Sequence, residues 1–224
     1  MRRAALALLF VGGMGGCVFG QLCGQDYSRD VEAIHSRAKD LGGQSPRLVL
    51  VGSSSIRKWP STDTVFASYD VVNAGFGGSC FWDLWELRDT LIYALGPDVL
   101  IVYEGDNDLH DGLDEDDILT AADMLLADIS RQLPHTRVVM IAPKASLARQ
   151  KLSDRYLSLN ANLAIVAKNH GAAWVDFWSV QHTEDGAIRQ DLFDADRLHL
   201  NEAGYAVWVT ELRRQLPWLD PNTP

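Results

Sequence analysis

Four short segments of this 224-residue chain carry groups suited to breaking an acyl bond. They are Gly52-Ser53-Ser54-Ser55, Asn73-Ala74-Gly75-Phe76-Gly77-Gly78, Gly105-Asp106-Asn107-Asp108 and Asp196-Arg197-Leu198-His199. Together they offer a hydroxyl nucleophile, hydrogen-bond donors for an oxyanion, and a histidine base close to a carboxylate. Hydrolysis through a covalent acyl-enzyme requires this combination of groups.

The spacing of Asp196 and His199 suits a base and its orienting carboxylate. Residues three apart lie on one face of a turn, so the carboxylate can meet Nδ1 of the imidazole. Nε2 is then free to take a proton from Ser54. Considered alone, a histidine beside a helix start is more often a surface residue, and a run of serines is more often a cap or a turn. The joint occurrence of the segments favours the catalytic interpretation.

Two further residues are candidates for stabilising an oxyanion. Asn107 carries a side-chain amide that can donate a hydrogen bond, and Gly78 can donate its backbone N–H with no side chain in the way. The alternative interpretations are an asparagine turn and a flexible glycine loop, both of which are common. We therefore expect Ser54, Gly78 and Asn107 to form an oxyanion hole, with the backbone N–H of Ser54 as its third donor.

The elements that must position these residues alternate between strands and helices. Apolar runs rich in Val, Ile and Leu predict strands buried on both faces at Arg47–Val51, Tyr69–Val72, Asp98–Tyr103, Arg137–Ala142 and Ala173–Phe177. Helical patterns cover Tyr27–Leu41 and Trp82–Ala94. Two apolar stripes predict further helices, one from Ile118 to Leu133 behind an Asp114 N-cap and one from Tyr156 to Val166. Asn201 opens a last helix, whose inward residues are Tyr205, Val209, Leu212 and Leu216. This alternation predicts a parallel sheet in a three-layer α/β/α sandwich.

The predicted architecture brings the chemical groups together. Sites in open parallel sheets lie beyond the carboxyl ends of the strands. Ser54, Gly78 and Asn107 each follow one of the first three predicted strands. Asp196 and His199 lie in the connection before the last helix, which can reach the same edge.

The four segments, in this order, resemble those of the SGNH hydrolases, the GDSL esterase/lipase superfamily. The resemblance runs from about Arg47 to the last helix and is carried by Val72-Asn73-Ala74-Gly75-Phe76-Gly77-Gly78, Gly105-Asp106-Asn107-Asp108 and Asp196-Arg197-Leu198-His199-Leu200-Asn201. It implies Ser54 as nucleophile, Gly78 and Asn107 as oxyanion donors, His199 as base and Asp196 as its orienter. It also implies a flavodoxin-like, five-stranded parallel sheet of order 2-1-3-4-5.

One position departs from the pattern of that family. Its members often have Gly-Asp-Ser where this chain has Gly52-Ser53-Ser54, so Ser53 replaces the aspartate. With Gly52 aligned, Ser54 is the nucleophile. A turn one residue longer would give that role to Ser55.

Composition limits the other classes of function. Hydrophobic residues make up 47% of the chain, enough for one buried core. The net charge is −10 and the sequence has no cluster of Lys and Arg, which argues against nucleic acid as a partner. The acidic group Asp106, Asp108, His110 and Asp111 does not have the spacing of a calcium loop. The 3 cysteines lack metal-ligand spacing and are too few for a disulfide framework. We expect neither a metal nor a cofactor.

The N-terminus has the pattern of an export signal. A basic start at Arg2 and Arg3 precedes an apolar run and four glycines, which predicts a signal peptide over residues 1–20 and a catalytic domain over residues 25–224. Two processing alternatives stay open: a lipoprotein signal ending before a lipidated Cys17, which would anchor the protein to a membrane, or cleavage after Gly20. In the first case Cys23 and Cys80 remain, paired or free. The expected location is the periplasm, the cell surface or the medium.

The expected function is a serine esterase that acts on small esters, acetyl esters first. Nearly every stretch between Arg47 and Leu216 is assigned to a strand, a helix or a short connection, which leaves no long apolar insertion to bury an acyl chain. Trp82 and Trp85 either line the mouth of the pocket or, more commonly for such residues, pack their helix. The alternatives are a lysophospholipase or thioesterase with the same site, and a non-catalytic surface binding module on the same fold.

Overall fold

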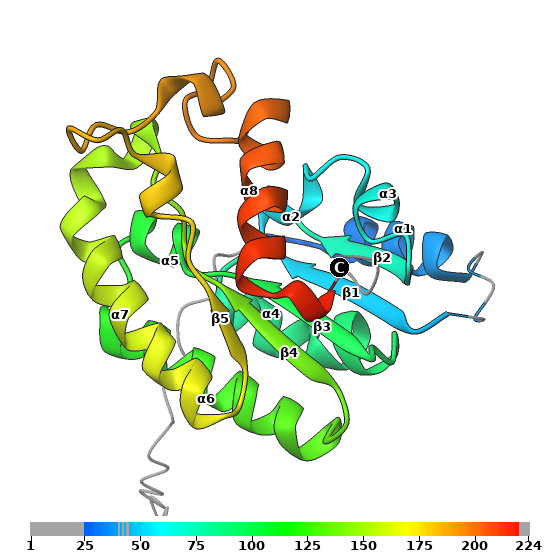
Figure 1. Ribbon diagram of the computed structural model, residues 1–224. Coiled ribbons are helices and arrows are strands. Elements are labelled where there is room, and N and C mark those ends of the chain that lie inside the picture. The colour runs from blue at the N-terminus through cyan, green and yellow to red at the C-terminus, as the bar shows by residue number, and fades with distance from the viewer. Residues whose placement is uncertain (1–24, 40, 42, 44, 220–224) are drawn as a thin grey trace, which may run out of the picture.

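A five-stranded parallel sheet forms the centre of the molecule (Figure 1). The computed structural model describes residues 25–39, 41, 43 and 45–219. The strands are β1 (Arg47–Gly52), β2 (Asp70–Gly75), β3 (Val99–Tyr103), β4 (Arg137–Ile141) and β5 (Ala173–Val175), in the order β2-β1-β3-β4-β5. Every pairing is parallel. The predicted fold class and strand order are therefore confirmed.

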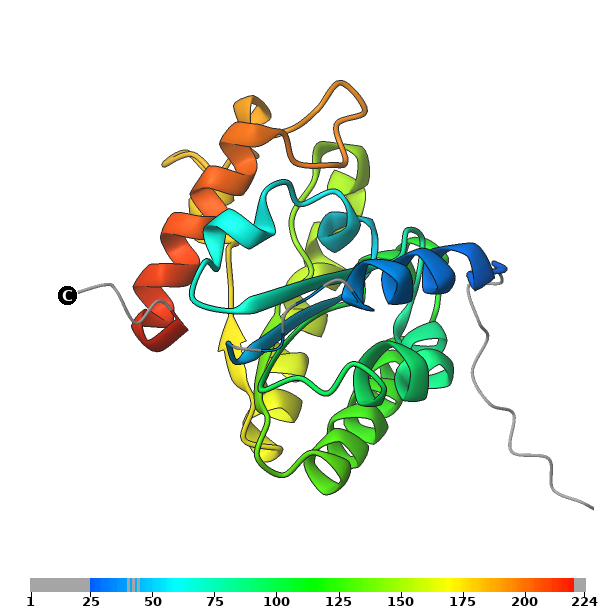
Figure 2. The same ribbon diagram turned by 90° about the vertical axis from the view of Figure 1, so that its right-hand side faces the viewer.

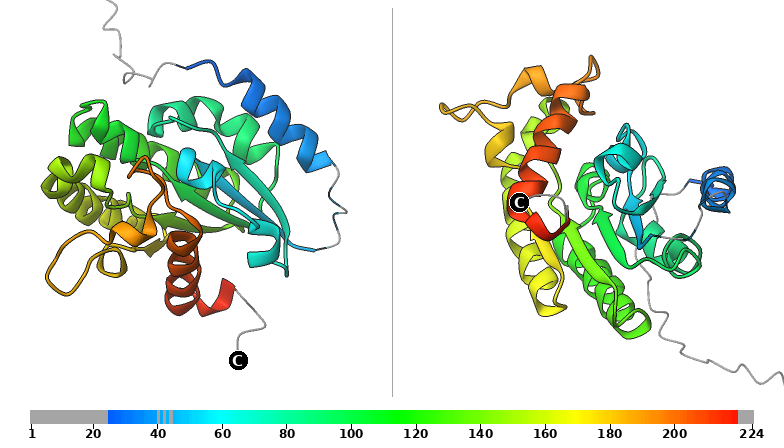
Figure 3. Two further views of the ribbon diagram at one scale, coloured as in Figure 1. Left: turned by 90° about the horizontal axis from the view of Figure 1, so that it is seen from above. Right: turned by 45° about the vertical axis from the view of Figure 1, so that its right-hand side comes forward.

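Helices cover both faces of the sheet, so the architecture is the predicted three-layer sandwich. One face carries α1 (Ser28–Lys39), α4 (Phe81–Arg88), α6 (Glu115–Gln132) and α7 (Ser153–Asn169). The other face carries α2 (Ser54–Arg57), α3 (Thr62–Val65) and α8 (Glu202–Gln215). Figures 2 and 3 show α1 and α8 on opposite sides of the sheet.

The strand sequences explain why both faces are covered. In β1, Val49 and Val51 point into the core beneath α1 and α6, whereas Leu48 and Leu50 point into the core beneath α8. Because side chains alternate along a strand, an unbroken apolar run has no polar face to offer to water. The sheet is therefore buried on both sides, as the sequence predicts.

The long helices begin where the sequence signals place them. α6 follows Asp114 as N-cap and has an acidic first turn, and Asn201 caps α8 by accepting a hydrogen bond from the backbone N–H of Gly204. Acidic residues and side-chain acceptors stabilise the free N–H groups of a first helical turn. The helix predicted from Trp82 to Ala94 is instead α4 followed by a π-helical turn, Asp89–Tyr93.

Trp208 on α8 is the centre of an aromatic cluster that holds this helix on the sheet. Its side chain is fully buried, and its ring lies 4.5 Å from that of Phe177 and 5.8 Å from that of Tyr103, centroid to centroid. The expected inward stripe omitted Trp208 and included Val209, which is only half-buried. Burial of a large aromatic ring stabilises the packing of α8 on the sheet.

The expectation of short connections throughout is wrong for residues 176–201. This long segment between β5 and α8 contains two short 3-10 turns, Ser179–Gln181 and Gln190–Leu192, and two isolated β-bridges. Leu192, Phe193 and Leu200 pack inward and hold the segment against the core. It passes over the carboxyl ends of the strands and carries Asp196 and His199 (Figure 1).

The predictions for the N-terminal segment concern residues outside the described ones. The signal peptide, Cys17 and Cys23 all belong to that segment, so export and lipidation stay predictions. Cys80 is disulfide-bonded. None of the described helices is long and apolar enough to cross a membrane.

Candidate active site

The turn after β1 presents Ser54 at the carboxyl edge of the sheet. Gly52, the last residue of β1, has a φ of +132°, and a Cβ at this position would lie 2.0 Å from the carbonyl oxygen of Tyr103 on β3. No side chain fits there, so glycine is required for the chain to leave the strand at this angle. Ser54 then forms the first residue of α2.

A continuous hydrogen-bond chain joins Ser54, His199 and Asp196. Oγ of Ser54 lies 2.9 Å from Nε2 of His199, and Nδ1 of the same ring lies 2.6 Å from Oδ2 of Asp196. Ser54 and the imidazole are partly buried. The arrangement can move a proton from the hydroxyl to the imidazole while the carboxylate holds the ring.

The neighbouring Ser55 has a different environment. It is buried, and its hydroxyl is hydrogen-bonded to the side chain of Tyr103. Its backbone carbonyl accepts a hydrogen bond of 2.8 Å from Tyr205 of α8. The imidazole of His199 is therefore hydrogen-bonded to Ser54 and not to Ser55.

Asp196 is held in its ionised form by the residues that follow it. Its Oδ1 accepts hydrogen bonds from the backbone N–H groups of Leu198 (3.0 Å) and His199 (2.9 Å). Partial burial acts to raise the pKa of Asp196, but the hydrogen bond from the His199 ring and these backbone donors outweigh it and hold the pKa well below its ordinary value. The carboxylate thus stays charged at neutral pH.

Two backbone N–H groups near Ser54 are available to a ligand. Gly78 has a φ of +85°, and a Cβ there would meet the side chain of Gln25 at 2.5 Å, so this position also favours glycine. Within the part of the chain that the structure describes, neither the N–H of Gly78 nor that of Ser54 has a hydrogen-bond acceptor. Both belong to partly exposed residues at the carboxyl edge of the sheet.

Asn107 contacts both of the turns that carry these N–H groups. It lies on the short helix α5 (Asp106–His110), which follows β3. Its Nδ2 donates hydrogen bonds to Oγ of Ser53 (2.6 Å) and to the carbonyl oxygen of Ser79 (2.8 Å). Ser53, the residue of this turn that departs from the Gly-Asp-Ser pattern, is therefore a partner of the Asn107 amide.

A buried charge cluster lies directly behind Asn107. Asp106 binds the ammonium group of Lys144 at 2.9 Å and the guanidinium of Arg149 at 2.5 Å, and it accepts hydrogen bonds from Tyr103 and Tyr156. Burial by itself would raise the pKa of Asp106, but the two cations outweigh it and hold the pKa well below its ordinary value. The sequence analysis missed Lys144 and Arg149; the place of Lys144 just after β4, at the edge that carries the site, was the available signal.

Buried carboxyl groups lie close to the Gly78 turn and bind polar groups of the same region. Glu104 accepts a hydrogen bond of 2.6 Å from the hydroxyl of Ser79, and burial followed by the charge of Asp108 raises its pKa well above the ordinary value. Asp108 accepts backbone N–H groups from Phe81 and Gly105, and burial raises its pKa to about 7. Asp83 binds the hydroxyl of Tyr27 and the backbone N–H of Cys80. These carboxyls hold residues 79–81, which directly follow Gly78, through hydrogen bonds.

Asp106 and Asp108, two members of the acidic group near Asn107, have partners other than a metal. Asp106 is paired with cations and Asp108 holds backbone N–H groups, as described above. Among the described residues, no group of three or more His, Cys, Asp or Glu side chains is arranged to bind a metal ion. Trp82 is buried in the core, and the partly buried Trp85 packs against that core with the guanidinium of Arg88 3.8 Å from its ring centroid, so both residues pack their helix.

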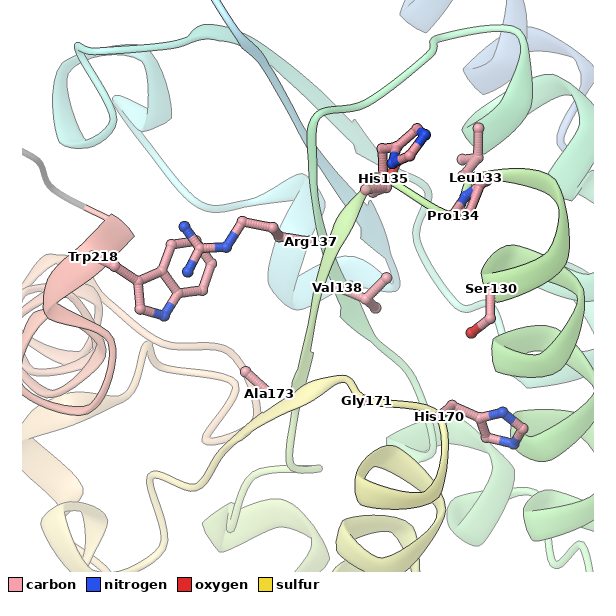
Figure 4. A pocket seen from close by; sticks show the side chains of 11 residues that line it. Ser130, Leu133, Pro134, His135, Arg137, Val138, His170, Gly171, Ala173 and Trp218 are labelled. Atoms are coloured by element: carbon pink, nitrogen blue, oxygen red, sulfur yellow. The ribbon is translucent and has the colours of Figure 1, made fainter.

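The cavity shown in Figure 4 lies away from these residues. It has a volume of about 470 Å³ and is lined by Arg137, Ala173 and Trp218, among others, at the amino ends of β4 and β5. Ser54 and His199 lie at the carboxyl edge of the sheet, so this cavity is not part of the candidate active site.

Comparison with known proteins identifies the family of the chain. The sequence model of the family described as GDSL-like Lipase/Acylhydrolase matches residues 25–207. A comparison with curated proteins finds no significant match.

Several solved structures share the fold. A GDSL-like lipase from Bacteroides thetaiotaomicron superposes with a TM-score of 0.69 at 17% identity, covering 84% of this chain and 97% of the other. A lipase/acylhydrolase from Enterococcus faecalis gives 0.64 at 19% identity, covering 80% and 100%. An acetylxylan esterase from Geobacillus stearothermophilus gives 0.64 at 14% identity, covering 76% and 94%. Because the family model spans most of the sequence, the chain belongs to the GDSL-like lipase/acylhydrolase family, the SGNH hydrolases.

Proposed function

We propose that this acylhydrolase is a serine esterase that cleaves small carboxylic esters, acetyl esters first, through an acyl-enzyme on Ser54. The observation that carries the proposal is the hydrogen-bond chain from Ser54 through His199 to Asp196, with distances of 2.9 and 2.6 Å. A serine hydroxyl is a weak nucleophile unless an oriented base takes its proton. The three groups are arranged for that transfer.

The proposed reaction begins with attack of Ser54 Oγ on the ester carbonyl. Nε2 of His199 takes the hydroxyl proton, and Asp196 stabilises the imidazolium that forms. The negative oxygen is held by the backbone N–H groups of Ser54 and Gly78 and by the amide of Asn107. His199 then gives its proton to the departing alkoxide, which leaves as the alcohol.

The second half of the reaction returns the enzyme. His199 takes a proton from water, the resulting hydroxide attacks the acyl carbonyl, and the proton returns to Ser54 Oγ as the acid leaves. The same donors hold the second oxyanion. Apart from the attacking water, residues of the chain supply every group that these steps use.

The preference for short acyl groups rests on the space around Ser54. Two cavities of about 470 Å³ occur in the described chain, and the walls of neither include Ser54, Asn107 or His199. Each methylene that an enzyme leaves in water forgoes about 0.8 kcal/mol of binding. The likeness in fold to an acetylxylan esterase is compatible with an acetyl group as the acyl part.

A series of nitrophenyl esters tests both the chemistry and the acyl preference. We expect Ser54→Ala to abolish hydrolysis of the acetyl ester while the matched variant Ser55→Ala keeps it. From acetyl to octanoyl, kcat/KM should rise by less than about tenfold. A larger rise would replace the short-acyl proposal with the lysophospholipase or thioesterase alternative. No hydrolysis by the folded wild type would favour the binding module.

Export belongs to the same proposal. The basic start, the apolar run and the glycines of residues 1–20 are typical of a signal peptide. N-terminal sequencing of the protein recovered from its native envelope should begin at Cys17 with lipid attached, or after Gly20. A mature protein that still begins at Met1 would contradict export by this signal.

A further inference from the structure

The orientation of the Asn107 amide decides whether that residue helps or hinders an oxyanion. The oxygen and nitrogen of an asparagine side chain are close in shape but opposite in hydrogen-bonding character. With Nδ2 toward the oxyanion the side chain attracts it, whereas with Oδ1 in that place it repels it. A free asparagine can flip between the two, so an effective donor needs a partner that fixes its orientation.

Arg149 contacts the oxygen side of this amide. It belongs to the 3-10 segment Leu147–Leu152, its side chain is only 8% exposed, and its Nη2 donates a hydrogen bond of 2.9 Å to Oδ1 of Asn107. A guanidinium has donors only and stays protonated, so it can accept nothing from an amide nitrogen. The flipped amide would bring two donors together and lose this bond.

The nitrogen side of the amide carries the complementary constraint. Nδ2 of Asn107 donates to the carbonyl oxygen of Ser79, which can only accept, and to the hydroxyl of Ser53. Arg149 and Ser79 therefore select the same orientation from opposite sides. Ser53 directly precedes Ser54 in the chain, so this N–H is bonded to the turn that carries the proposed nucleophile.

The guanidinium itself is fixed by the charge cluster. Nη1 of Arg149 binds both the carboxylate and the backbone carbonyl of Asp106, the latter at 2.9 Å. Asp106 shares its single negative charge between Arg149 and Lys144, so the cluster keeps one excess positive charge behind Asn107. A cation that donates to an amide oxygen also polarises the amide and strengthens its N–H donors.

We propose that Arg149 is a positioning residue that locks the Asn107 amide with its nitrogen, and not its oxygen, toward the Ser53-Ser54 turn and strengthens its N–H groups as donors. This inference rests on the proposed serine esterase function. The same 3-10 segment also contacts the other half of the site, because the backbone N–H of Ala148 donates to the carbonyl of Arg197, between Asp196 and His199.

A double-mutant cycle between Arg149 and Asn107 tests the proposal. We expect Arg149→Met to lower kcat by about 10- to 100-fold with little change in KM, because an oxyanion donor acts mainly in the transition state. In the Asn107→Ala background the same change should cost less than about threefold, because the amide that Arg149 orients is gone. Equal losses in the two backgrounds would overturn the proposal.

Lys144→Met is the matched control for a purely structural role. Lys144 binds the same Asp106 carboxylate and is equally buried, but its ammonium group has no hydrogen bond to Asn107. If Arg149 only stabilised the fold, Lys144→Met would lower kcat as much as Arg149→Met at equal loss of thermal stability. We expect a clearly smaller loss of kcat from Lys144→Met.

A second variant keeps the test decisive if Arg149→Met does not fold. Arg149→Lys retains the charge but not the planar fork that binds Asp106 and Asn107 together. It should lower kcat in the wild-type background and have little effect on kcat in the Asn107→Ala background. If Arg149→Lys lowers kcat equally in both backgrounds, the proposal is also overturned. Labelling of wild-type Ser54 by a fluorophosphonate separates this proposal from the esterase function on which it rests. A folded wild type that is not labelled overturns the esterase function itself. A labelled wild type in which the losses of kcat from the two substitutions are additive overturns only the role of Arg149.

Discussion

Asp196 and Asp106 each orient a group of the candidate site, but their surroundings are opposite. The side chain of Asp196 is 45% exposed on the connection between β5 and α8, whereas that of Asp106 is 6% exposed between two cations. Both have a pKa well below the ordinary value, Asp196 through hydrogen bonds and Asp106 through Lys144 and Arg149. The base side of the site is thus built on a surface segment, and the oxyanion side is built into the core.

This difference separates function from stability. An exposed carboxylate gains little from pairing because water screens its charge, so Asp196 can serve catalysis at little consequence for the fold. A buried carboxylate has lost its hydration, and its partners have lost theirs, so each depends on the other. Changes on the base side should therefore affect turnover, and changes behind the oxyanion side should affect both turnover and folding.

The largest effect on turnover should come from Asp196→Asn. The amide can hold the imidazole in the wrong tautomer and cannot stabilise the imidazolium, so we expect kcat to fall by about 10⁴-fold. The melting temperature should stay close to that of the wild type. Steady-state kinetics and thermal unfolding of the same preparation measure both. A loss below about tenfold would show that Asp196 is not the partner that the base needs.

Asp106→Asn should lower the stability of the fold as well as turnover. It leaves the buried cations of Lys144 and Arg149 without their counter-charge, and breaking a buried pair in this way costs about 3–5 kcal/mol of unfolding free energy. Urea unfolding of this variant beside Asp196→Asn is the direct comparison. Equal unfolding free energies of the two variants would contradict the division of the site into a surface segment around Asp196 and a core cluster around Asp106.

Asn107→Ala should act mainly on the chemical step. Losing one oxyanion donor typically costs about 2.7–4 kcal/mol, or about 10²- to 10³-fold in kcat. KM should change little, because the ground-state carbonyl gains less from the donor than the oxyanion does. An unchanged kcat with a raised KM would instead make Asn107 a residue that positions the substrate.

The smallest expected effect is a change in the pH dependence of stability, and it concerns the buried carboxyl groups close to the Gly78 turn. The pKa of Glu104 is raised well above its ordinary value by burial, so the folded protein holds this proton more tightly than the unfolded chain does. Its contribution to stability is complete below the unfolded pKa of about 4.3 and is lost as pH rises toward the folded pKa. Glu104→Gln has no proton to lose, so its stability relative to the wild type should increase with pH.

Urea unfolding of both proteins between about pH 5 and pH 8 measures this difference. Burial raises the pKa of Asp108 to about 7, so this residue also makes the unfolding free energy fall as pH rises. It does so equally in the wild type and in the Glu104→Gln variant. Asp106 and Asp196 have lowered pKa values, so the stability they contribute is lost only in more acidic solution. Parallel curves for wild type and Glu104→Gln would mean that Glu104 does not titrate in this range.

The sequence predicts most of the fold because its signals are local. Unbroken apolar runs give the five strands, and the caps Asp114 and Asn201 give the starts of α6 and α8. The segments that carry Ser54, Gly78, Asn107 and His199 could be placed at one edge because parallel strands end together. Each of these inferences needs only neighbouring residues and one topological rule.

The rest depends on contacts between residues distant in sequence. Lys144 and Arg149 look like ordinary surface cations until the fold buries them against Asp106, 38 and 43 positions away. The course of residues 176–201 is set by side chains that pack into the core, without the regular period of a helix or strand. The π-helical turn after α4 likewise leaves no signal in the apolar pattern.

The central claim is that Ser54 is the nucleophile activated by His199. It is tested most directly by labelling the protein with a fluorophosphonate and locating the adduct by mass spectrometry of the peptide that contains Ser53, Ser54 and Ser55. We predict a single adduct on Ser54, lost in Ser54→Ala and strongly slowed in His199→Ala, with normal labelling of Ser55→Ala. An adduct on Ser55, or labelling of Ser54 at an unchanged rate without His199, would contradict the account.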